Sequence, residues 1–426
     1  MGPNPFLEQS SAVKFPSLFE PPPGGMGINM NQDRIRIRLA EQEDMAAIMT
    51  VFAQARAAIA ALGIDQWQDG YPTEAHIEAD IEKGYAYVLC TGGAVQGYFA
   101  MISEPEPTYA RIYDGAWLTD GAYTTVHRVA MSDAMRGKGG AAEAMRYVIS
   151  RTLRAGTPAV RIDTHEGNLR MRKFLEKQGF SPCGTIYLQS GASRIAFELD
   201  LRPTLQKAPV VLYEDRNILI CEKPVGQPSQ PDPAHADGSD LHSRIASWRT
   251  ACGYSPEIYL VHRLDTATGG AIVYAKDRDS AARLGGMVVG KQIGKQYLAV
   301  VHGTTQAEGR MDDYLYHDKA KNKAFVVDSP RKGVKQASLR YRTLAQNGEC
   351  SLVEVTLETG RTHQIRAQFS HAGHPLLGDG KYGSRAKGCT TALWATRLCV
   401  THPKTGQQVE VQSKPPKTYP WNCFDI

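Results

Sequence analysis

The sequence predicts a mixed α/β protein with two domains, and three observations support this expectation. The chain has 426 residues, more than one ordinary hydrophobic core organises. Segments with the two-residue apolar period of strands alternate with segments that have the 3.6-residue period of helices. A polar stretch at Arg202–Pro209 separates an acidic N-terminal half from a basic C-terminal half.

Composition limits the class of protein. Hydrophobic residues make up 42% of the chain and charged residues 22%, which is typical of globular proteins. No apolar run approaches the ~20 residues that span a bilayer, and the N-terminus lacks the layout of a secretory signal. The eight cysteines are scattered, without a C-x-x-C pair or a histidine at metal spacing. We therefore expect a cytoplasmic protein with reduced thiols and no metal site.

Charge is distributed unevenly along the chain. Residues 1–208 carry 21 Lys and Arg against 23 Asp and Glu, whereas residues 209–426 carry 28 against 21. An excess of this size also occurs on ordinary solvated surfaces. The basic C-terminal half is nevertheless where we expect a polyanion to bind.

Residues 1–33 are rich in proline and glycine and show no sustained apolar period. Such a segment cannot bury enough apolar surface to fold, so we predict a disordered leader. Met26 or Met30 would serve equally well as the start of the chain.

Residues 34–200 are predicted to form one α/β domain. Strands are expected at 34–39, 85–90, 94–102, 122–131 and 160–163. Helices are expected from Met45 to a stop at Gly63, from the glycine-rich turn after the fourth strand to Gly156, and from Asn168 to Gly179. Residues 201–209 are predicted to be a linker.

Residues 210–426 form the second predicted domain, which is expected to be rich in β-structure. Strands are predicted at 210–213, 218–221, 258–261, 271–275 and 352–357, with a helix over about 238–251. A further helix is expected to open at Gly360-Arg361 and to end at Gly373, with Ile365, Phe369 and Ala372 as its buried face.

Asp265 and Arg361 are the first candidates for a site in this half. Asp265 follows a short apolar strand, a position where a carboxylate often only forms a turn. Arg361 lies where a strand meets a helix, and a surface ion pair is the simplest alternative role for it. His363, Gln364 and Arg366 are expected on faces that could meet phosphates or base edges.

Five motifs in register carry a family resemblance. They are Val211–Asp215 with Glu222-Lys223-Pro224, His262–Asp265 followed by Thr268-Gly269-Gly270, Lys295-Gln296-Tyr297, Thr359–Arg366, and Gly373–Gly383. Together they resemble the RluA-type pseudouridine synthases over essentially all of residues 209–426. The resemblance implies a catalytic domain with a central, mostly antiparallel sheet. It also implies a structured RNA, ribosomal or transfer, as the partner.

The resemblance implies roles for individual residues. Asp265 would be the nucleophile of an isomerisation that involves no redox change and needs no cofactor. Tyr297 would stack on the base and assist proton removal, and Arg361 would pair with Asp265 and keep it ionised. Arg263 would fill the RNA helix when the target uridine is flipped out. Relatives often carry a small RNA-binding domain in front, where this chain has the acidic α/β domain, so the RNA target stays open.

A glycine-rich turn, Arg136–Ala141, closes a strand and opens a helix in the N-terminal half. Such a turn presents backbone N–H groups and the positive end of a helix dipole to a pyrophosphate. With the N-x…E-K-x-G-F helix from Asn168 to Phe180, it resembles the GNAT acyltransferases over about 34–200. This resemblance implies a mixed sheet with flanking helices that binds acetyl-coenzyme A. The residues implied in cofactor binding are Val129, Met131, Arg136, Gly137, Gly139, Ala141 and Asn168.

Leu175 departs from the GNAT pattern, because many relatives have a tyrosine acid at this position. Tyr187, His127 and His165 are possible substitutes, although each is also a common type of structural residue. Trp67 either lines the acceptor pocket or belongs to the core. We therefore expect a bifunctional enzyme. The alternative is that the N-terminal domain is a non-catalytic module that holds RNA or a protein partner.

Overall fold

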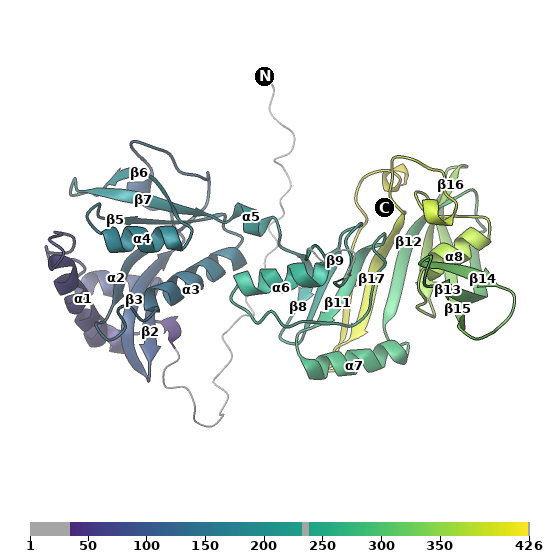
Figure 1. The fold of residues 1–426 in the computed structure, drawn as a ribbon, viewed down its shortest axis with the longest axis horizontal. Coiled ribbons are helices and arrows are strands. Elements are labelled where there is room, and N and C mark those ends of the chain that lie inside the picture. Colours follow the sequence, from purple (N-terminus) through teal and green to yellow (C-terminus); the bar gives the residue numbers. More distant parts are fainter. Residues whose placement is uncertain (1–34, 232–237, 425–426) are drawn as a thin grey trace, which may run out of the picture.

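The computed structural model describes residues 35–231 and 238–424, and two separate sheets organise them (Figure 1). One sheet has seven strands from residues 36–200, and the other has eleven strands from residues 210–412. The predicted mixed α/β class is therefore confirmed. The predicted leader at residues 1–33 lies outside the described residues. The predicted linker at 201–209 contains one helical turn, α5 (Arg202–Leu205).

The seven-stranded sheet is antiparallel except at its centre. In spatial order its strands are β1 (Arg36–Leu39), β2 (Ala86–Thr91), β3 (Ala94–Ile102), β4 (Thr124–Met131), β5 (Ala159–Thr164), β7 (Ser193–Asp200) and β6 (Ser181–Tyr187). The parallel pair, β4 and β5, is joined over two residue pairs, Thr124 with Val160 and Thr125 with Arg161. The later part of β4, which leads to the glycine-rich turn, therefore does not pair with β5.

Helices cover both faces of this sheet. They are α1 (Met45–Ala60) and α2 (Glu74–Glu82) on one face, and α3 (Gly140–Arg154) and α4 (Leu169–Lys177) on the other. The alternation of strand side chains explains this layering. Val88 packs with α1, whereas its neighbours Tyr87 and Leu89 pack with α3. The predicted strands and helices of this half are present, but α2, β6 and β7 were not predicted.

The eleven-stranded sheet is mostly antiparallel, as expected. Its main path runs β14 (Lys323–Val327), β13 (Glu308–Asp318), β15 (Val334–Gln346), β16 (Cys350–Leu357), β12 (Gly294–His302), β17 (Leu393–Thr401), β11 (Gly269–Ala275), β9 (Ile218–Lys223) and β8 (Val210–Glu214). Two short strands lie off this path, β10 (Tyr259–Leu260) beside β11 and β18 (Gln408–Gln412) beside β17. The pair of β11 and β17 is parallel.

Three helices cover this sheet. The helices α6 (Leu241–Ala251) and α8 (Gln364–His371) share an apolar cluster with one face, and α7 (Arg278–Val289) packs on the other. The helix predicted at 360–373 is α8, which begins at Gln364 and ends at His371 and is thus shorter than expected. No helix within residues 35–231 and 238–424 combines the length and the hydropathy needed to cross a membrane.

The two halves are joined by contacts between α3 and the end of α6, which lie side by side in Figure 1. The Arg154 guanidinium donates hydrogen bonds to the Cys252 carbonyl at 3.0 and 2.5 Å and stacks over the Tyr254 ring at 4.2 Å. Cys252 itself is buried in the apolar cluster of the N-terminal half. Arg244 donates to the Lys207 and Ala208 carbonyls, which fixes the connecting segment against α6.

Gly270 offers a test of how tightly the second sheet is built. A Cβ atom at Gly270 (φ +111°) would lie 2.3 Å from the Ala395 carbonyl oxygen on β17. We expect Gly270→Ala to lower the free energy of unfolding by about 3 kcal/mol, because strain and a backbone clash add. Gly348 is the control, since it also has a positive φ (+85°) but nothing within 4 Å of the added atom. Equal destabilisation of both variants in urea unfolding would contradict this account.

Candidate active site

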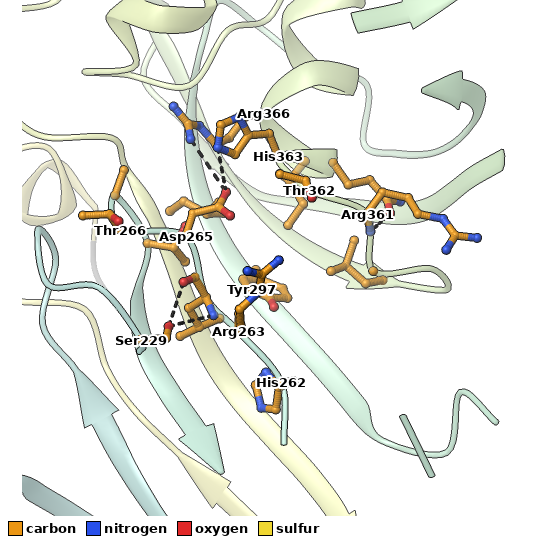
Figure 2. Close-up of a pocket in the computed structure, with 18 of the residues that line it drawn as sticks. Ser229, His262, Arg263, Asp265, Thr266, Tyr297, Arg361, Thr362, His363 and Arg366 are labelled. Atoms are coloured by element: carbon orange, nitrogen blue, oxygen red, sulfur yellow. Dashed lines mark hydrogen bonds and ion pairs between the residues drawn. The ribbon is translucent and has the colours of Figure 1, made fainter. Parts of the chain in front are cut away.

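Asp265 lies in the loop that connects β10 to β11, and several hydrogen bonds hold this loop (Figure 2). The Ser229 hydroxyl accepts from the Leu264 N–H at 3.1 Å and donates to the Leu264 carbonyl at 2.8 Å. The Asp265 carbonyl accepts from the Thr268 N–H at 2.9 Å, which closes a turn around the carboxylate. The nucleophile candidate therefore sits on a fixed turn.

A wide cleft of about 1980 Å³ opens over Asp265. Its walls come from the 225–231 and 260–268 segments, the start of β12, and the 357–366 segment. Exposed cations of the described chain line it, including Arg263, Lys291 and Lys381. A cleft of this size with a basic rim suits a large polyanion rather than a small metabolite.

Arg366 on α8 is the arginine that faces Asp265. Its Nη1 atom lies 3.7 Å from Asp265 Oδ2. Its Nε and Nη2 atoms donate to the two oxygens of Asp379 at 2.6 and 2.9 Å. Both Arg366 and Asp379 are almost fully buried. Arg366 therefore bridges two carboxylates inside the protein, a role that we had not predicted for it.

His363 is the second side chain that approaches the Asp265 carboxylate. Its Nε2 atom lies 3.7 Å from Asp265 Oδ2, and its Nδ1 atom lies 3.0 Å from the Tyr382 hydroxyl. Burial lowers the pKa of His363 to about 4, with Asp265 opposing the shift and Arg366 and Lys381 adding to it. The imidazole is therefore neutral at neutral pH. His363 and Gln364 are both buried and line the cleft, so the expectation that they meet RNA stays a prediction.

The expected pairing of Arg361 with Asp265 is wrong, and the start of α8 explains why. The helix begins at Gln364, after His363 adopts a left-handed conformation (φ 54°). Arg361 precedes this turn, and its side chain points away from Asp265 in Figure 2. Its Nε atom donates to the Gln336 carbonyl at 3.0 Å. Arg361 lines the outer part of the cleft.

Tyr297, Lys295 and Arg263 complete the cleft. Tyr297 is 6% exposed and follows a register shift between β12 and β17. Burial raises the pKa of its phenol, and the nearby Asp265 adds to the shift. Burial also lowers the pKa of Lys295 to about 8. Arg263 is exposed at the rim, where a residue that enters an RNA helix must lie.

Lys223 lies beneath the Asp265 loop and is fully buried. Its ammonium donates to the carbonyls of Pro224, Gln227 and Thr266 at 2.9, 2.6 and 3.3 Å. Burial lowers the pKa of Lys223 to about 7, and Asp265 opposes this shift. The lysine therefore ties the loop that bears Asp265 to the end of β9.

The glycine-rich turn of the N-terminal half opens α3 as predicted. Gly137 (φ +76°) and Gly139 (φ +88°) adopt left-handed conformations, and Gly139 caps the helix. The N–H groups of the first helical turn have no partner within the helix. The backbone therefore has the form that binds a phosphate group.

The other residues that we expected to bind the cofactor lie on β4, near the start of α3 and at the start of α4. Val129 lies on β4 at a register shift between β3 and β4, Met131 pairs with Gly97 on β3, and Arg136 forms an ion pair with Asp133 at 2.6 Å. Ala141 lies in the first turn of α3. The Asn168 side chain accepts from the Met171 N–H at 3.1 Å and so caps α4.

The candidate acids of this half differ in surroundings. Leu175 is fully buried in the core. His127 lies between two carboxylates, 3.1 Å from Glu106 and 3.8 Å from Asp163, and its hydrogen bond holds the pKa of Glu106 at about 2. His165 contacts Asp65 at 3.4 Å, and Tyr187 is exposed.

Trp67 packs edge-on against Phe52 at 5.7 Å, as a core residue does. No group of His, Cys, Asp or Glu side chains in the described ranges is arranged to hold a metal.

Sequence reasoning overlooked Asp379 and Tyr382 as members of the C-terminal site. Both lie in the Gly373–Gly383 motif, so the signal was present in the sequence. What the motif could not show is that its turn folds back onto α8, which places Asp379 against Arg366 and Tyr382 against His363.

Comparison with known proteins relates each half of the chain to a family. Residues 217–371 match the RNA pseudouridylate synthase family, and residues 52–180 match the acetyltransferase (GNAT) family. An uncharacterized RNA pseudouridine synthase of Bacillus subtilis is 34% identical over 212 residues, covering 49% of this chain and 69% of its own length. Ribosomal large subunit pseudouridine synthase D of Yersinia pestis is 34% identical over 235 residues, with 50% and 69% covered. The chain therefore belongs to the RNA pseudouridine synthase family, with a GNAT-fold domain fused in front.

Solved structures also resemble each half. A GNAT-family acetyltransferase from Streptococcus agalactiae is 38% identical, with 40% of this chain and 98% of that chain covered, at a TM-score of 0.36. Human RNA pseudouridylate synthase domain containing 4 is 22% identical, with 49% and 89% covered, at a TM-score of 0.42.

Lys223 gives a pH-dependent prediction. Lys223→Met removes three hydrogen bonds, so we expect it to lower the free energy of unfolding by about 1–3 kcal/mol. The wild-type lysine has a pKa of about 7 when folded and an ordinary, higher pKa when unfolded. The unfolded chain therefore binds more protons above pH 7, and the wild-type protein gains stability as pH rises towards 10.

The gap between wild type and Lys223→Met should accordingly be wider at pH 9 than at pH 6. Melting temperatures at the two pH values measure it. Lys321→Met is the matched control, because Lys321 is exposed and its loss should give the same small effect at both pH values. A gap for Lys223→Met that narrows as pH rises would refute the buried-lysine account.

Proposed function

We propose that residues 210–426 isomerise uridine to pseudouridine in structured RNA, with Asp265 as the nucleophile. The observation that carries this proposal is the position of Asp265. Its carboxylate lies on a fixed turn at the base of a cation-rimmed cleft, 3.7 Å from both Arg366 and His363. A carboxylate held between a cation and a neutral N–H group is kept in one orientation for attack.

The reaction can be written with these residues. The Asp265 carboxylate attacks C1′ of the target ribose, and the N1–C1′ bond breaks, with its electron pair leaving on uracil. The base turns, C5 attacks C1′, and the bond to Asp265 breaks. The C5 proton is lost and N1 gains one, so the product is an isomer of the substrate. Tyr297, whose raised pKa keeps its phenol protonated, provides a ring for the base to stack on.

The RNA substrate is proposed from the relatives. Several are named ribosomal large subunit pseudouridine synthases, so large-subunit ribosomal RNA is the first substrate to test, and transfer RNA is the second. Arg263, exposed at the cleft rim, is placed to enter the space that the flipped uridine leaves. We also propose that the enzyme works in the cytoplasm, where these RNAs are made.

For the N-terminal domain we propose acyl-coenzyme A binding and transfer of the acyl group to an amine. The left-handed glycines at the start of α3 and the short parallel pairing of β4 with β5 support a pantetheine between the strands and a pyrophosphate over the turn. The residues proposed to contact the cofactor are Val129, Met131, Arg136, Gly137, Gly139 and Ala141. Asn168 is proposed to act by capping α4.

Asp265→Asn tests the nucleophile. The amide keeps the size of the side chain but cannot attack C1′, so we expect turnover to fall below a few per cent of wild type. RNA affinity should stay within a few fold, because phosphate contacts elsewhere supply most of it. Release of tritium from uridine labelled at C5 measures turnover, and filter binding measures affinity. Asp279→Asn, an exposed carboxylate on α7, is the control. Substantial remaining turnover in Asp265→Asn would rule out this role.

Gly139→Val tests the cofactor site. A ligand at ~100 times its dissociation constant should stabilise the wild-type protein by roughly 2.7 kcal/mol. A side chain at Gly139 would occupy the open space in front of the turn, so acetyl-coenzyme A should no longer stabilise the variant. Gly156→Val is the matched control, since Gly156 ends the same helix with φ +70° and equally open surroundings. Absence of acetyl-coenzyme A binding to wild type in calorimetry would refute the proposal.

A further inference from the structure

His363 combines an unusual backbone conformation with polar groups facing both of its ring nitrogens. His363 adopts φ 54° immediately before α8, a conformation that costs a residue with a Cβ atom about 1–2 kcal/mol. Both ring nitrogens face polar groups of other segments, Tyr382 on one side and Asp265 on the other. Backbone strain that is retained beside a reactive group is a reason to look for a role.

The hydrogen bonds of Tyr382 determine which ring nitrogen of His363 carries the proton. The Tyr382 hydroxyl accepts from the Ala324 N–H at 2.8 Å and lies 3.0 Å from His363 Nδ1. A buried hydroxyl needs an acceptor for its own proton. Within the described chain, Nδ1 is the acceptor that the structure offers it. The Tyr382 hydroxyl therefore donates to Nδ1, and the neutral ring carries its proton on Nε2.

The opposite tautomer, with the proton on Nδ1, would create two unfavourable contacts. A proton on Nδ1 would point at a hydroxyl that already accepts from Ala324, and the hydroxyl proton would then lack a partner. The lone pair of Nε2 would at the same time face the Asp265 carboxylate, 3.7 Å away. Both arrangements are unfavourable in a buried site.

We propose that Tyr382 and His363 form a relay that orients the nucleophile: Tyr382 fixes the Nε2–H tautomer of His363, and this N–H points at the Asp265 carboxylate, 3.7 Å away. His363 and Tyr382 are positioning residues, since both act through Asp265. The inference rests on the proposed role of Asp265. The carboxylate thereby has two different partners, the Arg366 cation and a neutral N–H, which together determine the direction of its free lone pairs.

Several charged or titratable groups face His363, and the pH test must take account of them. They come from the nucleophile loop, α8, the turn after α8 and β13, and are Asp265, Arg366, Asp379, Lys381, Tyr382 and His317. Burial keeps the ring itself neutral above about pH 4, so His363 should not titrate over the assay range.

The first experiment measures the tautomer directly. ¹⁵N-histidine-labelled full-length protein gives distinct chemical shifts for protonated and bare ring nitrogens, and loss of one set in His363→Asn assigns His363. We expect an Nε2–H ring in wild type and a shift toward Nδ1–H in Tyr382→Phe. A wild-type ring protonated on Nδ1 would overturn the inference. This readout does not depend on activity, so it stands even if the proposed reaction fails.

The second experiment measures single-turnover rate against pH on unmodified large-subunit ribosomal RNA. Tyr382→Phe should be slower by about 10-fold, the effect of losing one buried hydrogen bond. The deficit should be similar at pH 6 and pH 8, because His363 stays neutral over this range. Tyr213→Phe is the control, since it loses one hydroxyl bond, to Asp215, at the far edge of the sheet. An unchanged rate in Tyr382→Phe, with wild type active, would overturn the inference. An inactive wild type would instead contradict the proposed function.

The third experiment separates positioning from a merely structural role. His363→Gln places an amide N–H near the position of Nε2, whereas His363→Asn places it near Nδ1. We expect the Gln variant to keep more activity. A structural role predicts the reverse, because Asn tolerates a positive φ better than Gln does. Melting temperatures show whether each variant is folded at the assay temperature. Activity of Asn equal to or above that of Gln would count against the relay.

Discussion

The buried ion pair between Arg366 and Asp379 is the interaction on which the rest of the site depends. Two parallel hydrogen bonds of 2.6 and 2.9 Å fix the guanidinium in one orientation. Removing one partner of such a pair leaves a charge without compensation, at a cost of about 3–5 kcal/mol. Because Nε and Nη2 are bound to Asp379, Nη1 is left to face Asp265. The turn after α8 therefore determines where the cationic partner of the nucleophile lies.

The sequence predicted the mixed α/β class and the elements with a clear period, because strand and helix periods are local properties. It did not predict α7 or most strands from β12 onward. It did not predict which arginine reaches Asp265. The Thr359–Arg366 motif contains two arginines five positions apart, and only the start of the helix decides which one points inward. That start depends on the left-handed backbone at His363, which no periodicity reveals. Tyr382 was likewise visible in a motif, but its contact with His363 arises from tertiary folding.

The contact between the two halves has a consequence for how they act together. Helix α3 begins at the glycine-rich turn and ends at Arg154, which binds the Cys252 carbonyl. Cys252 is 1% exposed, so the end of α6 is part of the apolar cluster of the N-terminal half. A helix is stiff along its axis, and α3 therefore connects the proposed phosphate site to the catalytic half without a flexible segment. The acidic N-terminal half therefore packs against the end of α6 through α3.

The charges around Asp265 explain why the site combines one cation with neutral donors. Arg366 already serves two carboxylates, Asp265 and Asp379, and Lys223 is buried below the loop with a pKa near 7. A second permanent cation against Asp265 would add a desolvation cost and would weaken the carboxylate as a nucleophile. His363, kept neutral by burial, instead contributes a directed N–H without a further charge. Tyr297, kept protonated by burial and by Asp265, is neutral as well. The exposed cations lie instead at the rim of the cleft, where the RNA backbone would lie in the proposed reaction.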